Sequence, residues 1–122
     1  MTILFESVDR NSYLVATISD TTLCTQRAKS ILNAIGSECQ KSGYCKALLN
    51  ELTLEKRNIA NHEIRGLSEH MPDIYLACLC KPELIDNTSK LFSAFTFTNR
   101  YTVKYFSIES EAVTWLRSMP GN

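Results

Sequence analysis

Short apolar runs alternate with longer segments of helical period along this chain, and the alternation limits its possible folds more than any other feature. The runs are rich in leucine, β-branched and aromatic residues, as strands are. They span residues 3–8, 13–18, 45–49, 74–80 and 102–106. Strands that alternate with helices are typical of an α/β domain, in which right-handed crossovers place successive strands parallel in one sheet.

The N-terminal third predicts an antiparallel hairpin followed by a helix. Residues 9–12 between the first two runs have turn composition, so Ile3–Val8 and Tyr13–Ile18 are expected to pair. Asp20, Thr21 and Thr22 offer N-caps to the helix, and Gly43 is placed to end it. Its buried stripe recurs at helical spacing through Cys24, Ala28, Ile31, Ile35 and Cys39.

Three further helices are predicted between and after the later strands. Asn58 or Asn61 can cap the second, whose apolar stripe is Ala60, Ile64, Leu67 and Met71, with Pro72 beyond its end. The third spans residues 87–98, with Leu91, Ala94, Phe95 and Thr98 on one face. Ser107 can cap the last, whose buried face is predicted to be Ala112, Trp115, Leu116 and Met119.

Together these elements predict one α/β domain covering residues 1–122, with an edge hairpin followed by alternating βα units around a mostly parallel five-stranded sheet. Ile74–Cys80 is nearly continuous in apolar residues, as expected of a strand covered on both faces. No apolar stretch approaches the roughly 20 residues that span a bilayer, and no secretory signal is evident. We therefore expect a cytoplasmic protein without a transmembrane segment.

Charge and composition argue against several classes of function. Basic and acidic residues are equal at 13 each, so no net positive field favours nucleic acid. The glycines are scattered, which excludes a Gly-rich phosphate loop. The five cysteines follow no disulfide or zinc spacing, and neither a metal nor another cofactor is expected. An enzyme that pairs a cysteine with His62 or His70 stays open, beside the simpler interpretation of core thiols and solvated histidines.

The stretch Phe95–Leu116 carries a more specific pattern. It contains Asn99-Arg100 in a turn, a strand ending at Phe106, and the run Glu111-Ala112-Val113-Thr114-Trp115-Leu116 in the last helix. This ending resembles that of the SpoIIAA-like, or STAS-like, small bacterial proteins, a group also compared with lipid-transfer domains of the SEC14 type. The order and lengths of the expected elements fit the same group over nearly the whole chain.

The resemblance implies a SpoIIAA-like fold and a regulatory role. In the best-known members, the anti-sigma-factor antagonists, a partner kinase phosphorylates a serine at the start of the helix after the third strand. This chain has Asn58-Ile59-Ala60-Asn61 there, without a hydroxyl, and Thr53 and Ser68 are the nearest candidates. It also has Tyr101 where the turn of the family has glycine.

Two functions follow as hypotheses. The first is a non-enzymatic protein–protein interaction or regulatory module, whose partner is another protein or a second copy of the chain. The second is a binding module for a small apolar or lipid-like ligand in a cleft near the third helix, where aromatic residues cluster. Sites in parallel sheets lie at the carboxyl ends of the strands. The predicted ligand or partner contacts are Asn58, Asn61, His62, Asn99 and Arg100.

Overall fold

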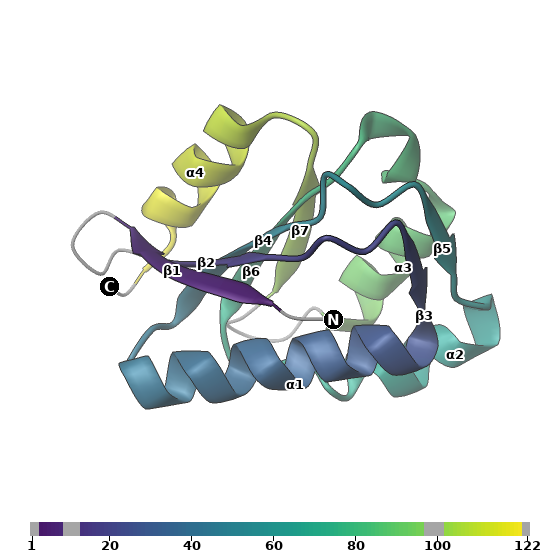
Figure 1. The fold of residues 1–122 in the computed structure, drawn as a ribbon, viewed down its shortest axis with the longest axis horizontal. Helices are drawn as coiled ribbons and strands as arrows, with labels where there is room; N and C mark the ends of the chain where they lie inside the picture. The colour runs from purple at the N-terminus through teal and green to yellow at the C-terminus, as the bar shows by residue number, and fades with distance from the viewer. Residues whose placement is uncertain (1–2, 9–12, 97–101, 121–122) are drawn as a thin grey trace.

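The structure, a computed structural model, describes residues 3–8, 13–96 and 102–120, and Figure 1 shows its fold. Strands and helices alternate as predicted, which confirms the α/β class. In chain order the elements are β1 (Leu4–Val8), β2 (Tyr13–Thr17), β3 (Thr22–Cys24), α1 (Thr25–Ser42), β4 (Lys46–Asn50), β5 (Lys56–Asn58), α2 (Asn61–Ser68), β6 (Tyr75–Leu79), the short 3-10 helix η1 (Pro82–Leu84), α3 (Asn87–Thr96), β7 (Val103–Phe106) and α4 (Glu109–Ser118).

Five of the described strands form one mostly parallel sheet in the order β1-β2-β4-β6-β7. β1 and β2 are antiparallel, with Leu4 opposite Thr17, so the predicted hairpin is confirmed at one edge. The neighbours β2, β4, β6 and β7 all run parallel. β3 and β5, which follow β2 and β4 in the chain, form a separate short parallel pair. The small pair therefore extends the structure beyond the carboxyl ends of these two strands.

The helices lie on both faces of the sheet (Figure 1). α1, α2 and α3 contribute to one hydrophobic cluster, because each is a crossover between parallel neighbours and right-handed crossovers in one direction share a face. α4 closes the opposite face with a smaller cluster. Every residue of β6 is buried, which confirms the prediction of a strand covered on both sides. The larger cluster contains the cavity described below.

Trp115 fastens α4 to the sheet, as predicted from its place on the apolar stripe. Its ring meets Tyr75 edge-on, with centroids 6.4 Å apart, and lies tilted against Phe106 at 5.7 Å. Ala112 and Leu116 of the same stripe are fully buried, whereas Trp115 and Met119 are only half-buried. The aromatic pairs on β6 and β7 therefore hold the indole against the sheet, while part of Trp115 stays exposed.

The prediction for the start of α1 was wrong. Cys24 is its N-cap residue, without a side-chain cap, and Thr22 belongs to β3. The pairing of β3 with β5 takes this segment into an extended conformation before the helix can begin. Asp20 is instead buried and accepts from Arg27 Nε at 3.0 Å. The predicted end is confirmed, because Gly43 has φ +82° and donates to the Cys39 carbonyl.

Two other predicted caps were also wrong. Ala60 is the N-cap residue of α2, so neither Asn58 nor Asn61 caps it. Instead Glu63 Oε1 accepts from the Ala60 backbone N–H at 3.0 Å and satisfies one of the free donors at the helix start. Ile108, not Ser107, is the N-cap residue of α4.

The buried face of α3 differs from the predicted one. Ser89, Phe92 and Thr96 are buried, whereas Leu91 is half-buried and Ala94 and Phe95 are exposed. Thr98 lies outside the described residues. The reason is a local motif at the helix start: the Asp86 N–H donates to Ser89 Oγ, and the Ser89 N–H donates to Asp86 Oδ1. These bonds turn Ser89 inward, and the helical period then brings Phe92 and Thr96 to the same side.

Candidate functional site

The structure places the predicted contact residues on the surface. Asn58 ends β5 opposite Cys24, and Asn61 and His62 are the first residues of α2; all three are exposed. Asn99 and Arg100 lie outside the described residues. Asn58, Asn61 and His62 thus share one corner beyond the carboxyl ends of the strands. The residues on either side of Asn58, however, are the ones that reach a cavity.

A cavity of about 40 Å³ lies inside the larger cluster, between the sheet and the helices α1, α2 and α3. Its walls are mainly aliphatic, with Ile31 from α1, Leu67 from α2 and Leu76 from β6 among the lining side chains. Phe92 of α3 closes one side. The polar residues among the lining side chains are Glu51, Arg57, Cys78, Thr88 and Tyr105. Such a setting, apolar with a few convergent polar groups, is typical of small-molecule sites.

Glu51 and Arg57 form a buried ion pair at this cavity. Arg57 Nη2 donates to Glu51 Oε1 at 2.8 Å, and the two side chains are only 6% and 4% exposed. Arg57 Nη1 also donates to the Leu84 carbonyl of η1 and lies 3.9 Å from Asp86 Oδ1. Burial raises the pKa of Glu51, and the facing guanidinium acts in the opposite direction. The pair therefore ties β5, η1 and the end of β4 together.

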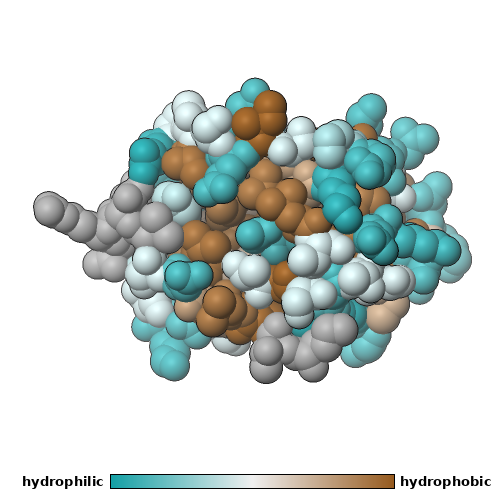
Figure 2. Space-filling view, turned by 45° about the horizontal axis from the view of Figure 1, so that its top comes forward, coloured by the Kyte–Doolittle hydropathy of each residue, from teal (hydrophilic) through white to brown (hydrophobic). Residues whose placement is uncertain are grey.

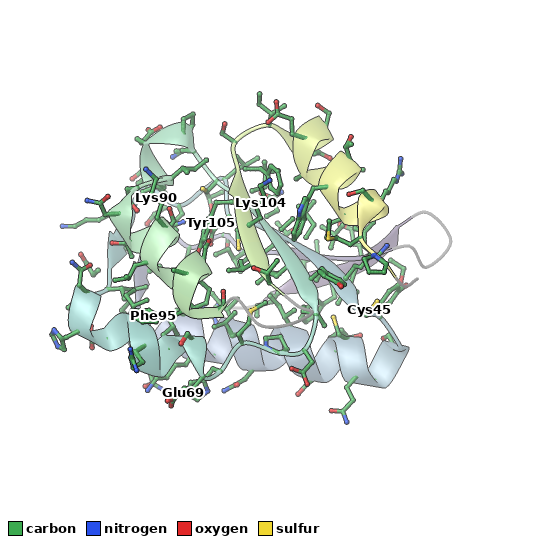
Figure 3. The ribbon with its side chains drawn as sticks, turned by 180° about the vertical axis from the view of Figure 1, so that it is seen from behind. Cys45, Glu69, Lys90, Phe95, Lys104 and Tyr105 are labelled. Carbon is green, nitrogen blue, oxygen red and sulfur yellow. The ribbon has the colours of Figure 1, made fainter. Side chains whose placement is uncertain are left out.

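Tyr105 lies beside this pair. Figure 3 shows it on the α3 side of β7, with Lys104 on the α4 side. The Arg57 guanidinium carbon stands 5.2 Å from the centre of the Tyr105 ring, a cation–π contact. Burial raises the pKa of Cys78, and the Tyr105 side chain lowers it in part. Burial raises the pKa of Tyr105 well above its ordinary value, so the hydroxyl keeps its proton.

The cysteines of the core are poor nucleophiles. Burial raises the pKa of Cys39 to about 12 and that of Cys80 to about 11, and it raises the pKa of Cys78 as well. These three thiols are buried as the sequence predicts, whereas Cys24 is exposed, against prediction. Cys24 lies outward because β3 is a short strand at the margin, with exposed residues at both ends. A thiol that stays protonated cannot attack, so the core cysteines give no support to a cysteine enzyme.

The two histidines also lie outside the cavity. His62 is exposed, and His70 Nδ1 is 3.4 Å from the side-chain oxygen of Asn33 on α1. Within residues 3–8, 13–96 and 102–120, no group of three or more His, Cys, Asp or Glu side chains is arranged to hold a metal ion. Both histidines therefore contribute to the surface of α2 and its end.

An open hollow lies on the other face of the sheet, between β7 and α4. It has a volume of about 340 Å³ and is lined by Lys104, Phe106, Ser110, Glu111, Thr114 and Trp115. Lys104 Nζ lies 5.5 Å from the centre of the Phe106 ring, a cation–π contact within the lining. Figure 2, which views the face that carries α4, shows apolar side chains interrupted by polar ones. The hollow is shallow and holds no buried polar group, so it makes a weaker candidate site than the cavity.

Comparison with protein-family models, with curated protein sequences and with solved structures finds no match. In the part of the chain that the structure describes, no helix has the length and apolar character needed to cross a membrane.

Proposed function

We propose that this protein is a binding module that holds a small, mainly apolar molecule in the cavity between the sheet and α1, α2 and α3. The observation that carries the proposal is a cavity with aliphatic walls in which a buried ion pair and Tyr105 converge. It is the second hypothesis drawn from the sequence, and the α3 residues Thr88 and Phe92 in the cavity lining support it.

The size of the cavity limits what can enter without movement. An engineered cavity that binds benzene has a volume of about 150 Å³, and the volume here is about 40 Å³. A ligand of more than a few atoms must therefore displace a side chain. We propose that Phe92 is the side chain that moves. Its ring forms part of the cavity wall on α3, so a change of its position would enlarge the cavity.

The test is to enlarge the cavity at Phe92 and to measure the binding of apolar probes. Phe92→Ala is expected to bind benzene, and the wild-type protein is expected to bind xenon, with NMR shifts confined to methyl groups that line the cavity. Phe95→Ala is the matched control: Phe95 lies on the same helix but is 37% exposed and outside the lining. The proposal fails if neither probe shifts the lining methyl groups of either protein, or if Phe95→Ala gains benzene binding equally.

A protein partner is the second candidate, and one observation favours it. Leu52 and Ile108 are exposed large hydrophobic residues, at 41% and 51%, and they follow the carboxyl ends of β4 and β7. Such residues suit contact with another protein or a second copy of the chain, as the resemblance to STAS-like regulators implies. A double variant, Leu52→Ser with Ile108→Ser, should show weaker self-association in sedimentation experiments and should retain less of any partner protein on purification from the host. Leu4→Ser, on the distant edge strand β1, should leave both unchanged.

A further inference from the structure

We propose that the ligand binds Glu51 through a hydrogen-bond donor, a hydroxyl or an ammonium group, and that the site excludes carboxylates. This inference rests on the proposed function, because it names the polar end of the molecule held in the same cavity. It takes three observations together: acceptor capacity of Glu51 that no described residue fills, the balance of charge around Arg57, and the Thr88 hydroxyl in the cavity lining.

Glu51 has unused capacity to accept hydrogen bonds. Its Oε1 accepts from Arg57 Nη2 at 2.8 Å, and among the described residues no other side chain or backbone group donates to this carboxylate. The residue is 3% exposed and lines the cavity. An ionised carboxylate has about four acceptor positions, and a buried one gains from each that is filled. A donor inside the cavity would fill a position that the protein leaves open.

Charge determines which donors suit the site. Glu51 and Arg57 are the charged residues in the lining, and they neutralise each other. Asp86 adds a second carboxylate 3.9 Å from the same guanidinium, so one positive charge faces two negative ones. A carboxylate ligand would bring a third negative charge to Arg57, in a setting where water screens charge poorly. A neutral hydroxyl or a cationic ammonium group avoids that repulsion.

The wall formed by α3 offers a partner for the oxygen of an alcohol. Thr88 of α3 lines the cavity and is half-buried, and its hydroxyl can donate or accept. Tyr105 is less available, because its ring is already engaged by the Arg57 guanidinium, 5.2 Å from its centre. A hydroxyl ligand could therefore donate to Glu51 and accept from Thr88 at once.

The first test uses the wild-type protein and three ligands of matched chain length: n-butanol, n-butylamine and n-butyrate. At neutral pH the amine is cationic and the butyrate anionic. NMR titration is expected to give dissociation constants for the alcohol or the amine about tenfold or more below that of butyrate. Butyrate binding as tightly as both would overturn the inference and leave the proposed function standing. If none of the three ligands binds and xenon does not bind either, the proposed function itself is overturned.

The second test removes the charge of Glu51 without changing its size. Glu51→Gln should raise the dissociation constant of n-butylamine about tenfold, and the difference in affinity between n-butylamine and butyrate should become smaller. Glu55→Gln is the matched control, because Glu55 lies in the same loop and is exposed. Unchanged selectivity in folded Glu51→Gln would contradict the role of Glu51. If Glu51→Gln does not fold, because Arg57 is left unpaired, the wild-type titrations decide the question alone.

Discussion

Arg57 and Glu51 meet at 2.8 Å inside the core, although Arg57 lies in a three-residue strand and Glu51 directly follows β4. The pair stabilises the fold only while both members are present, since a lone buried charge lacks compensation. Arg57→Met should therefore lower the free energy of unfolding by about 3 to 5 kcal/mol, measured by urea denaturation. The double variant Glu51→Leu, Arg57→Met should recover much of that loss. Equal losses in the single and double variants would contradict a coupled pair, and exposed Lys56→Met serves as control.

The thiols should differ sharply in their reactivity. Cys24 is exposed, whereas Cys39, Cys78 and Cys80 are buried and their pKa values are raised. Brief treatment with iodoacetamide, followed by peptide mass spectrometry, should label Cys24 first and the three core cysteines only after denaturation. Early labelling of Cys78 would show that the cavity opens to reagents of this size.

The free energy of unfolding should decrease at alkaline pH, and part of this decrease should come from Cys39. Its pKa is about 12 in the folded protein against an ordinary 9.0, so the unfolded chain loses this proton first. The stabilising contribution is complete below about pH 9 and is lost as the pH rises towards 12. Cys39→Ala should reduce the slope of unfolding free energy against pH there by up to about 1.4 kcal/mol per pH unit. An unchanged slope would contradict the assignment.

The long, regular elements could be predicted from the sequence because their signals are local. The apolar run around β6 and the helical period before Gly43 each lie within one segment and agree with the structure. The starts of α1 and α2 could not be predicted from the sequence. β3 and β5 pair across more than thirty residues of chain, and this pairing changes where each helix begins. The intrinsic secondary-structure propensity of each segment does not predict that pairing.

The candidate site was missed for a related reason. Glu51 and Arg57 belong to a polar stretch that has loop composition, and their burial depends on η1 and β7 from later in the chain. One signal could have indicated them: a glutamate directly after a buried strand, with an arginine six residues on. Asn58 is predicted as a contact residue from its capping ability, but it is exposed, and its neighbours Arg57 and Ile59 line the cavity instead.

Trp115 should contribute to stability rather than to binding. Truncation of a fully buried Trp costs about 3 to 5 kcal/mol; Trp115 is half-buried, so Trp115→Ala should cost about 2 to 3 kcal/mol through its lost contacts with Tyr75 and Phe106. Thermal unfolding measures the effect, and Thr114→Ala, at the neighbouring exposed position, should change it much less. An unchanged melting temperature with lost binding of a partner would make the residue functional.

The last prediction concerns regulation at the start of α2. A phosphate at a helix N-terminus adds nearly two negative charges beside the positive end of the helix dipole, which is how one serine can switch a surface. Here that position is held by Ala60 and Asn61, and Glu63 already occupies the Ala60 N–H. We therefore expect no phosphate between Asn50 and Met71 in protein isolated from growing cells or incubated with host cytosol and ATP.

The two nearby hydroxyls are already engaged in the fold. Thr53 Oγ1 donates to the Asp20 carbonyl at 2.9 Å, and Ser68 Oγ donates to the Arg65 carbonyl at 2.6 Å. A phosphate on Thr53 would break its bond to the loop that precedes β3, and one on Ser68 would sit at the negative end of the α2 dipole. Phosphopeptide mapping measures occupancy at both. Stoichiometric phosphate on Thr53 or Ser68 would show that a switch exists at a different point of the chain, and Thr53→Val or Ser68→Ala would then identify which.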